Sequence, residues 1–245
     1  MDIAGYILAA LATLIILTIH EYSHAYAAYK LGDNTAKSLG RLSLNPIKHL
    51  DIVGAICMVI FHFGWAKPVP IDPRNFKKPK RDFAITALAG PLSNIFFAFL
   101  SALLALLSIK LLYGIDVESE FVYKLIYNVI QFLYIFCQLN IGIAIFNLIP
   151  VPPLDGSRLL TAILPSKIYF RIMRYEKYIY LFLIGWLFLG SYVARALLSI
   201  PFVAASPVLS FIASLFSLSG LLSRLIATVF YGIFDLWLLI PFLQY

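Results

Sequence analysis

The sequence predicts an all-α membrane protein: a polytopic helical bundle of about five to six transmembrane helices, with a re-entrant, partly β segment after the first helix. Three observations predict this fold class. The chain is 62% hydrophobic and only 13% charged, and its mean hydropathy is +0.90. Long apolar stretches alternate with short polar ones. One apolar stretch, 52–64, is unusually short and has basic residues on both sides.

The composition excludes several classes of protein. A soluble domain is typically about a quarter charged, so this chain has too little polar surface to cover a water-soluble body. A cytosolic enzyme, a secreted disulfide scaffold and a disordered chain are therefore excluded. Cys57 and Cys137 lie in apolar surroundings, which indicates buried thiols rather than a disulfide framework. The first residues carry no basic region, so we expect no cleavable signal peptide.

The expected membrane spans follow from length and hydrophobicity. A membrane-spanning helix needs about 20 mostly apolar residues. The segments that meet this requirement are 3–29, 84–112, 122–149 and 178–200. Two further segments, 201–223 and 225–243, are hydrophobic enough but are interrupted by Pro201, Pro207 and Asp235. We expect Asp235 to be interfacial or paired with a cation such as Arg224.

The short apolar segment 52–64 has a different character. As a helix it would rise only about 20 Å, which is less than the hydrocarbon core of roughly 30 Å. Since both flanks are basic, a true span would place them on opposite sides of the membrane. We therefore expect residues 38–72 to form a re-entrant element with strand-like pieces. The alternating run Arg41–Asn45 fits a half-buried strand.

The distribution of positive charge predicts the orientation. Fifteen of the nineteen Lys and Arg residues fall in two windows, 30–81 and 158–177. Basic loops that flank apolar spans remain in the cytoplasm, and the acidic loop 113–120 is then outside. The net charge of +7 therefore indicates a lipid bilayer, and not a nucleic acid, as the partner. We expect an integral protein of a prokaryotic cell membrane with its N-terminus outside.

The chemistry-bearing motif lies in the first span. His20-Glu21-Tyr22-Ser23-His24 is an H-E-x-x-H sequence. On a helix, residues four apart share one face, so both imidazoles can bind one zinc ion while Glu21 acts as the general base. Ionisable residues at membrane depth are costly, which marks this group as functional. The alternative is polar packing between helices.

A catalytic zinc usually has a third protein ligand. His49 lies in a basic loop, where we expect it to be solvated or near the membrane interface, and His62 lies in the short apolar segment, where we expect a hydrogen-bonded interior residue. Asp155 is the better candidate, because prolines fix the chain before it and Gly156 allows a tight turn after it. The alternative for Asp155 is a cap of the next helix.

The expected topology favours the metal site. His20 and His24 lie near the cytoplasmic end of the first span, and Asp155 lies just beyond the cytoplasmic end of the span 122–149. An orientation that depends only on Lys and Arg positions thus places all three residues at one depth and the active site toward the cytoplasm.

With these residues the chain resembles the site-2 protease family of intramembrane zinc metalloproteases, in its short type without an inserted PDZ domain. Three stretches within residues 20–158 carry the likeness. They are His20–His24; the segments 40–51, 64–70 (GWAKPVP) and 89–94 (AGPLSN); and Asn147–Gly156. We expect an intramembrane metalloprotease core at residues 1–200, followed by C-terminal hydrophobic helices at residues 201–245, to which the resemblance does not extend.

The resemblance also implies roles for single residues. His20, His24 and Asp155 match the ligands of one zinc ion, and Glu21 matches the general base. Asn147 matches a residue that positions substrate or stabilises the oxyanion. Asn94 lies in a family signature without an assigned role, and for Gly90 we expect close helix packing.

The function expected from this resemblance is hydrolysis of a peptide bond within or near a transmembrane helix of a protein or peptide substrate, as in regulated intramembrane proteolysis. A catalytically inactive scaffold or chaperone of the same fold is the main alternative. The intact Glu21 argues against a scaffold, which needs no base. A metal transporter is a third reading, but the sequence contains no internal repeat of the kind that transporters use.

Overall fold

The computed structural model describes residues 3–61, 64–114, 119–215, 217–240 and 243. Helices dominate these residues. In chain order they are α1 (Ile3–Lys30), α2 (Thr35–Ser38), η1 (Pro46–Lys48), α3 (Ile52–Phe61), η2 (Pro73–Asn75), α4 (Pro79–Gly114), α5 (Glu120–Leu148), α6 (Gly156–Ile163), α7 (Ser166–Arg174), α8 (Glu176–Leu198), α9 (Pro201–Ala205), α10 (Pro207–Leu215) and α11 (Leu218–Leu238). The expected all-α class is confirmed.

Four described helices are long and apolar enough to cross a membrane: α1, α4, α5 and α11. Helix α8 becomes a fifth if its two halves, which meet at 50°, are counted as one span. The expected number of five to six is therefore met only at its lower end. The segment 201–223 forms no single span, because Pro201 and Pro207 each begin a short new helix and proline is disfavoured inside a helix.

The expected re-entrant, partly β segment is not supported. Residues 52–61 form helix α3, and the described part of 38–72 contains no strand. Its one β interaction is an isolated antiparallel bridge between Leu50 and Ala66. The run Arg41–Asn45 is irregular, because Asn45 caps η1 and the Arg41 side chain donates to the carbonyl of Lys67 at 2.6 Å. Alternation of polarity alone cannot supply a partner strand.

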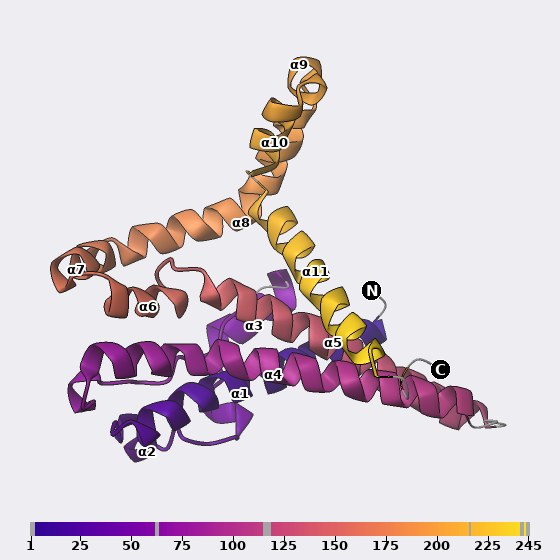
Figure 1. The fold of residues 1–245 in the computed structure, drawn as a ribbon, viewed down its shortest axis with the longest axis horizontal. Coiled ribbons are helices and arrows are strands. Elements are labelled where there is room, and N and C mark those ends of the chain that lie inside the picture. The colour runs from indigo at the N-terminus through magenta and orange to yellow at the C-terminus, as the bar shows by residue number, and fades with distance from the viewer. Residues whose placement is uncertain (1–2, 62–63, 115–118, 216, 241–242, 244–245) are drawn as a thin grey trace.

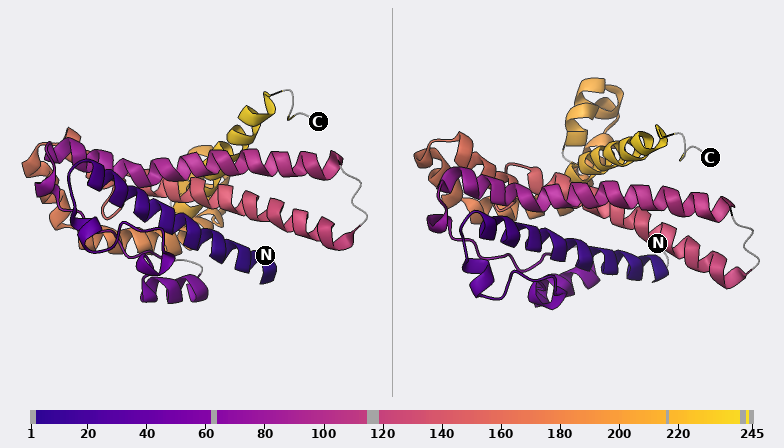
Figure 2. Two further views of the ribbon diagram at one scale, coloured as in Figure 1. Left: turned by 90° about the horizontal axis from the view of Figure 1, so that it is seen from below. Right: turned by 60° about the horizontal axis from the view of Figure 1, so that its bottom comes forward.

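Helix α4 is the centre of the bundle and contacts α1, α5, α6 and α11. Figure 2 shows α1, α4 and α5 running side by side along the long axis. Small residues on α4 allow close approach: Ala98, Ala102 and Ala105 are fully buried in one core cluster. Phe230 and Phe234 of α11 belong to the same cluster. Residues from the expected C-terminal part thus complete the core around α4, and the division at residue 200 stays a prediction.

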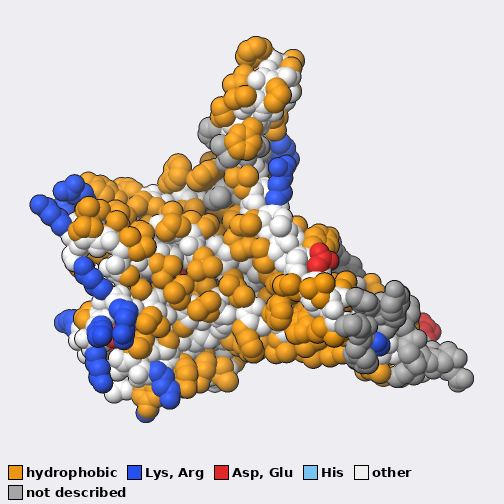
Figure 3. Space-filling model, viewed as in Figure 1, with side chains coloured by type: hydrophobic (Ala, Val, Ile, Leu, Met, Phe, Trp, Pro, Cys, Tyr) orange, Lys and Arg blue, Asp and Glu red, His pale blue; other side chains and the backbone are white. Residues whose placement is uncertain are grey.

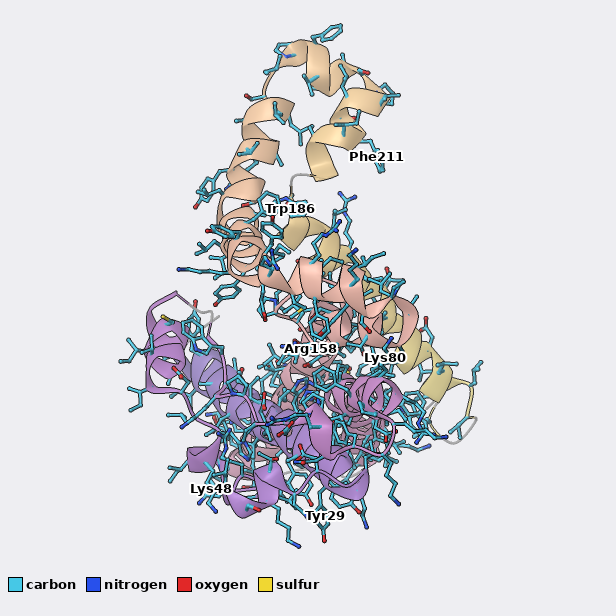
Figure 4. The ribbon with its side chains drawn as sticks, turned by 90° about the vertical axis from the view of Figure 1, so that its left-hand side faces the viewer. Tyr29, Lys48, Lys80, Arg158, Trp186 and Phe211 are labelled. Atoms are coloured by element: carbon cyan, nitrogen blue, oxygen red, sulfur yellow. The ribbon has the colours of Figure 1, made fainter. Side chains whose placement is uncertain are left out.

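The second half of α8 leaves the bundle and forms an arm together with α9 and α10 (Figure 1). This arm comprises residues 189–215, and α11 then returns to pack on α5. Figure 4 labels Phe211 on the arm, and its side chain is 63% exposed. The arm therefore presents apolar side chains to its surroundings, as expected of a segment in lipid.

The surface separates charge from apolar groups. Figure 3 shows hydrophobic side chains over most of the visible face, while many Lys and Arg side chains gather at the end formed by α2, α6 and α7. This is the pattern of an integral membrane protein with one strongly basic end. That this end faces the cytoplasm stays a prediction.

Small residues at the contact of α1 with α5 provide a test of the packing. Ala12 is fully buried against Ile16 and Phe136, whereas Ala10 on the same helix is exposed. We expect Ala12→Leu to destabilise the protein by about 1–3 kcal/mol, because it overpacks a closed interface. Ala10→Leu is the matched control and should change little. Thermal unfolding in detergent measures both, and an equal loss in the two variants would contradict this packing.

Candidate metal centre

Helix α1 places two imidazoles on one face. His20 and His24 are one turn apart, with ring centroids 4.6 Å from each other at an interplanar angle of 86°. Both are almost completely buried, with exposed fractions of 4% and 5%. A histidine pair in an otherwise apolar interior must have polar partners, because burying an unpaired polar group costs free energy.

The third residue comes from the turn between α5 and α6. Gly156 makes this turn possible: a Cβ at this position would overlap the carbonyl oxygens of Leu148 and Ile149 at the end of α5. Asp155 precedes the first residue of α6, but its side chain makes no capping hydrogen bond. It reaches the histidines instead, so the alternative of a simple helix cap is wrong.

The three side chains meet at one point. Asp155 Oδ2 lies 3.0 Å from His20 Nε2 and 3.1 Å from His24 Nε2, and the two Nε2 atoms are 3.0 Å apart. Together the three residues could hold a metal ion. Atoms that bind a tetrahedral zinc at about 2.0–2.1 Å lie roughly 3.3 Å from one another. The observed spacing is close to that of a zinc ligand set.

The hydrogen bonds of the two Nδ1 atoms determine whether each Nε2 atom carries a proton or a lone pair. His24 Nδ1 donates to the carbonyl oxygen of Thr86 at 2.7 Å, and His20 Nδ1 donates to Asn94 Oδ1 at 3.0 Å. Each neutral ring then presents the lone pair of Nε2. Two lone pairs and a carboxylate oxygen thus converge, and three acceptors repel one another unless a cation lies between them. The residues fit a zinc ion.

The carboxyl group of Asp155 is prepared to act as an anion. Burial opposes its ionisation, but the adjacent imidazoles of His24 and His20 outweigh burial and lower the pKa of Asp155 well below its usual range. An ionised carboxylate is the form that binds metal.

Glu21 lies next to the ligands but on another side of α1, about 100° around the helix from His20. Its Oε2 accepts a hydrogen bond of 2.8 Å from the backbone N–H of Val69. Together with His24 and Asp155, it lines a cavity of about 800 Å³. The carboxylate is therefore oriented toward the same space as the metal ligands.

This cavity lies between the start of α4, the segment 68–73 and helices α6 and α7. Its wall is largely apolar, with Phe83, Tyr169 and Phe170 among its residues. Polar groups lie at its rim, including Lys80 and Arg158, which Figure 4 labels at the basic end of the molecule. The cavity thus combines apolar wall residues with charged residues from the basic end of the fold.

Asn147 and the two histidines considered as alternative ligands do not join this group among the described residues. Asn147 is in the last turn of α5, half-buried, and does not belong to the described lining of the cavity. His49 is buried, with an exposed fraction of 2%, and its Nε2 donates to the carbonyl of Ser43 at 2.7 Å. The expectation that His49 is solvated is wrong, because the loop folds over it. His62 falls outside the described residues.

The sequence carried no indication of the role of Asp33, which anchors the segment whose Val69 N–H binds the Glu21 carboxylate. Asp33 is fully buried and accepts from Asp72 N and from Asn75 Nδ2, both at 2.8 Å. These bonds hold the chain just after Val69 against the end of α1. The backbone donor of Val69 itself carries no side-chain signal, so no sequence pattern could have revealed it.

Gly90 is closer to the site than its small size suggests. A Cβ at this position would lie 2.6 Å from His20 Cε1 and would also overlap the imidazole of His24. The expected close packing is real, but its partners are the two imidazoles themselves. Because Gly90 has no side chain, α4 can approach α1 closely enough for both imidazoles to turn their Nε2 atoms toward Asp155.

We expect Gly90→Ala to lower zinc affinity by about tenfold or more, because the added methyl group would push the imidazoles of His20 and His24 out of position for binding one ion. Gly185→Ala in α8 is the matched control, since a Cβ there meets nothing within 4 Å. Competition with a fluorescent zinc chelator measures both variants. Equal affinity of Gly90→Ala and wild type would contradict the position of Gly90.

Asn94 provides a second test, because it is 1% exposed and holds His20 through its side-chain oxygen. Asn94→Leu removes the acceptor, and we expect a loss of zinc affinity of about 10–100-fold. Asn94→Asp keeps an acceptor oxygen and should retain most of the affinity. The same chelator competition distinguishes the two, and an identical loss in both would show that only the shape of Asn94 matters.

Comparison with known proteins gives relatives in bacteria. A protein of Bacillus subtilis (strain 168) named "Putative zinc metalloprotease YwhC" is 43% identical over 190 residues, which cover 76% of this chain and 84% of the relative. A protein of Mycolicibacterium smegmatis named "Putative zinc metalloprotease Rip2" is 28% identical over 155 residues, covering 62% of this chain and 55% of the relative. No solved structure matches the chain significantly.

The sequence model of peptidase family M50 matches residues 8–190. This range contains the histidine pair of α1, the turn with Asp155 and the part of α4 that packs against them. The match covers well over half of the sequence, so the chain belongs to peptidase family M50.

Proposed function

We propose that this metalloprotease is a zinc-dependent intramembrane endopeptidase that hydrolyses a peptide bond within or near a transmembrane helix of a membrane protein. The observation that carries the proposal is the convergence of His20 Nε2, His24 Nε2 and Asp155 Oδ2 beside a carboxylate, Glu21, in one cavity. The elements that hold this group include α1 and α4, which are long and apolar enough to span a membrane.

In this proposal His20, His24 and Asp155 hold the zinc. When bound, zinc would lower the pKa of a coordinated water from near 16 to about 7 and polarise the substrate carbonyl. Glu21 accepts the proton of the attacking water and later gives it to the leaving amine. The N–H of Val69 keeps the Glu21 carboxylate turned toward the cavity. Asn147 is proposed to stabilise the developing oxyanion once substrate is bound.

The cavity supports a substrate in extended form. In a helix the carbonyl oxygens are engaged with N–H groups four residues on, so a transmembrane substrate must unwind locally before attack. The apolar wall suits such a segment, and the charged rim with Lys80, Arg158 and Glu176 gives water a path to the site. In the proposed orientation this rim faces the cytoplasm.

The test begins with the metal. We expect about one zinc per chain in wild type and in Glu21→Gln, because Glu21 is no ligand, and a clear loss of zinc in Asp155→Ala. Elemental analysis of detergent-purified protein measures this without a known substrate. Absence of zinc from wild type after resupply would exclude the metalloprotease mechanism.

The second step asks where cleavage occurs. Proteoliposomes that contain the enzyme and bacterial membrane proteins are analysed by mass spectrometry for new peptide termini. We expect termini within transmembrane segments with wild type and not with Glu21→Gln. Zinc binding without any new termini would favour the scaffold. Termini confined to soluble loops would reject the intramembrane mechanism.

A further inference from the structure

Two arginines stand out in the last part of the chain. Between Tyr178 and Ile240 the only charged residues are Arg195, Arg224 and Asp235. Arg195 lies on the second half of α8 and Arg224 on the second turn of α11. Both line a pocket of about 250 Å³, distinct from the metal centre. Figure 3 shows Lys or Arg side chains at the base of the otherwise uncharged arm.

Neither guanidinium has an ion-pair partner among the described residues. Arg195 Nε donates to the carbonyl of Ser191 at 3.3 Å, and its guanidinium lies 4.8 Å from the ring of Tyr192. Asp235 follows Arg224 by eleven residues on α11, so it is about 16 Å further along the helix. The expected pairing of Asp235 with Arg224 is therefore wrong, and two positive charges share one pocket.

The rest of the pocket also favours an anion. Its lining includes Ser191, Ser217 and Gly220. Ser217 caps α11 and its hydroxyl accepts from the N–H of Gly220 at 3.1 Å. The first turn of a helix has N–H groups without intrahelical acceptors, and the helix dipole favours negative charge there. Two arginines, two serines and the first turn of α11 thus border the same space.

We propose that this pocket binds a phosphate group, and that the ligand is the headgroup of an acidic phospholipid. Guanidinium groups bind phosphate through two parallel hydrogen bonds, and basic pockets between membrane helices take anionic headgroups. The pocket lining also offers apolar contacts to acyl chains: Leu198 is 37% exposed, and Leu221 lines the pocket from α11. A bound anion relieves the repulsion between the arginines and fixes the arm on α11.

The test compares ligand-induced stabilisation of the detergent-purified full chain. We expect phosphatidylglycerol to raise the unfolding temperature of wild type by about 5 °C and phosphatidylcholine to raise it much less. Arg195→Gln/Arg224→Gln should lose at least half of the phosphatidylglycerol effect. Arg171→Gln/Arg174→Gln is the matched control: it removes the same charge from exposed residues of α7 and should keep the effect.

Two further comparisons identify the chemical nature of the ligand. Arg195→Lys/Arg224→Lys keeps the charges but not the planar guanidinium, and we expect it to retain only part of the effect. Inorganic phosphate is tested alone: stabilisation that equals that of phosphatidylglycerol, and that requires both arginines, would identify free phosphate as the ligand. An equal response to phosphatidylglycerol in wild type and in the glutamine variant would overturn the proposal.

Native mass spectrometry of wild type is an independent measurement, because it does not depend on the folding of a variant. We expect one retained phospholipid mass that excess detergent removes slowly. Wild type without any retained phospholipid, and without a shift on phosphatidylglycerol, would reject the site. Neither readout depends on proteolysis, so their failure would leave the metal centre untouched.

Discussion

The interaction on which the rest of the structure depends is the meeting of three acceptor atoms, His20 Nε2, His24 Nε2 and Asp155 Oδ2, within 3.1 Å of one another. Such a group is unfavourable without a cation, and its cost is greatest in an apolar interior. The surrounding helices accommodate the three side chains by leaving space for the rings and by accepting hydrogen bonds from their Nδ1–H groups. Gly90 makes room for the rings, and Asn94 with the Thr86 carbonyl fixes their tautomers.

The sequence revealed the parts of this arrangement that side chains encode. The helical spacing of the two histidines, the proline-bounded turn before Asp155 and the orientation taken from Lys and Arg positions together predicted that these residues meet. The long apolar runs predicted α1, α4 and α5 with bounds close to those observed. These features are local, because hydrophobic periodicity and helix-ending proline or glycine residues act within one helix or strand.

The features that could not be predicted are those made by contacts between distant backbones. The N–H of Val69 and the carbonyl of Thr86 act through groups that every residue has. The polar alternation of Arg41–Asn45 indicated a strand, but a strand exists only with a partner, and the described chain offers one isolated bridge at Leu50 and Ala66. Likewise, Pro201 and Pro207 divided an apolar run that composition alone would have counted as a span.

The cavity has two walls that are built differently. Helix α1 carries His20, His24 and Glu21 and packs against α4 in the bundle, whereas α7 contacts only its chain neighbours α6 and α8 among the described helices. A catalytic group held on rigid elements keeps its geometry, and motion concentrates where packing is sparse. In the proposed function, α7 with Tyr169 and Phe170 is therefore the wall that would move to admit a substrate, while His20 and His24 on α1 stay in place.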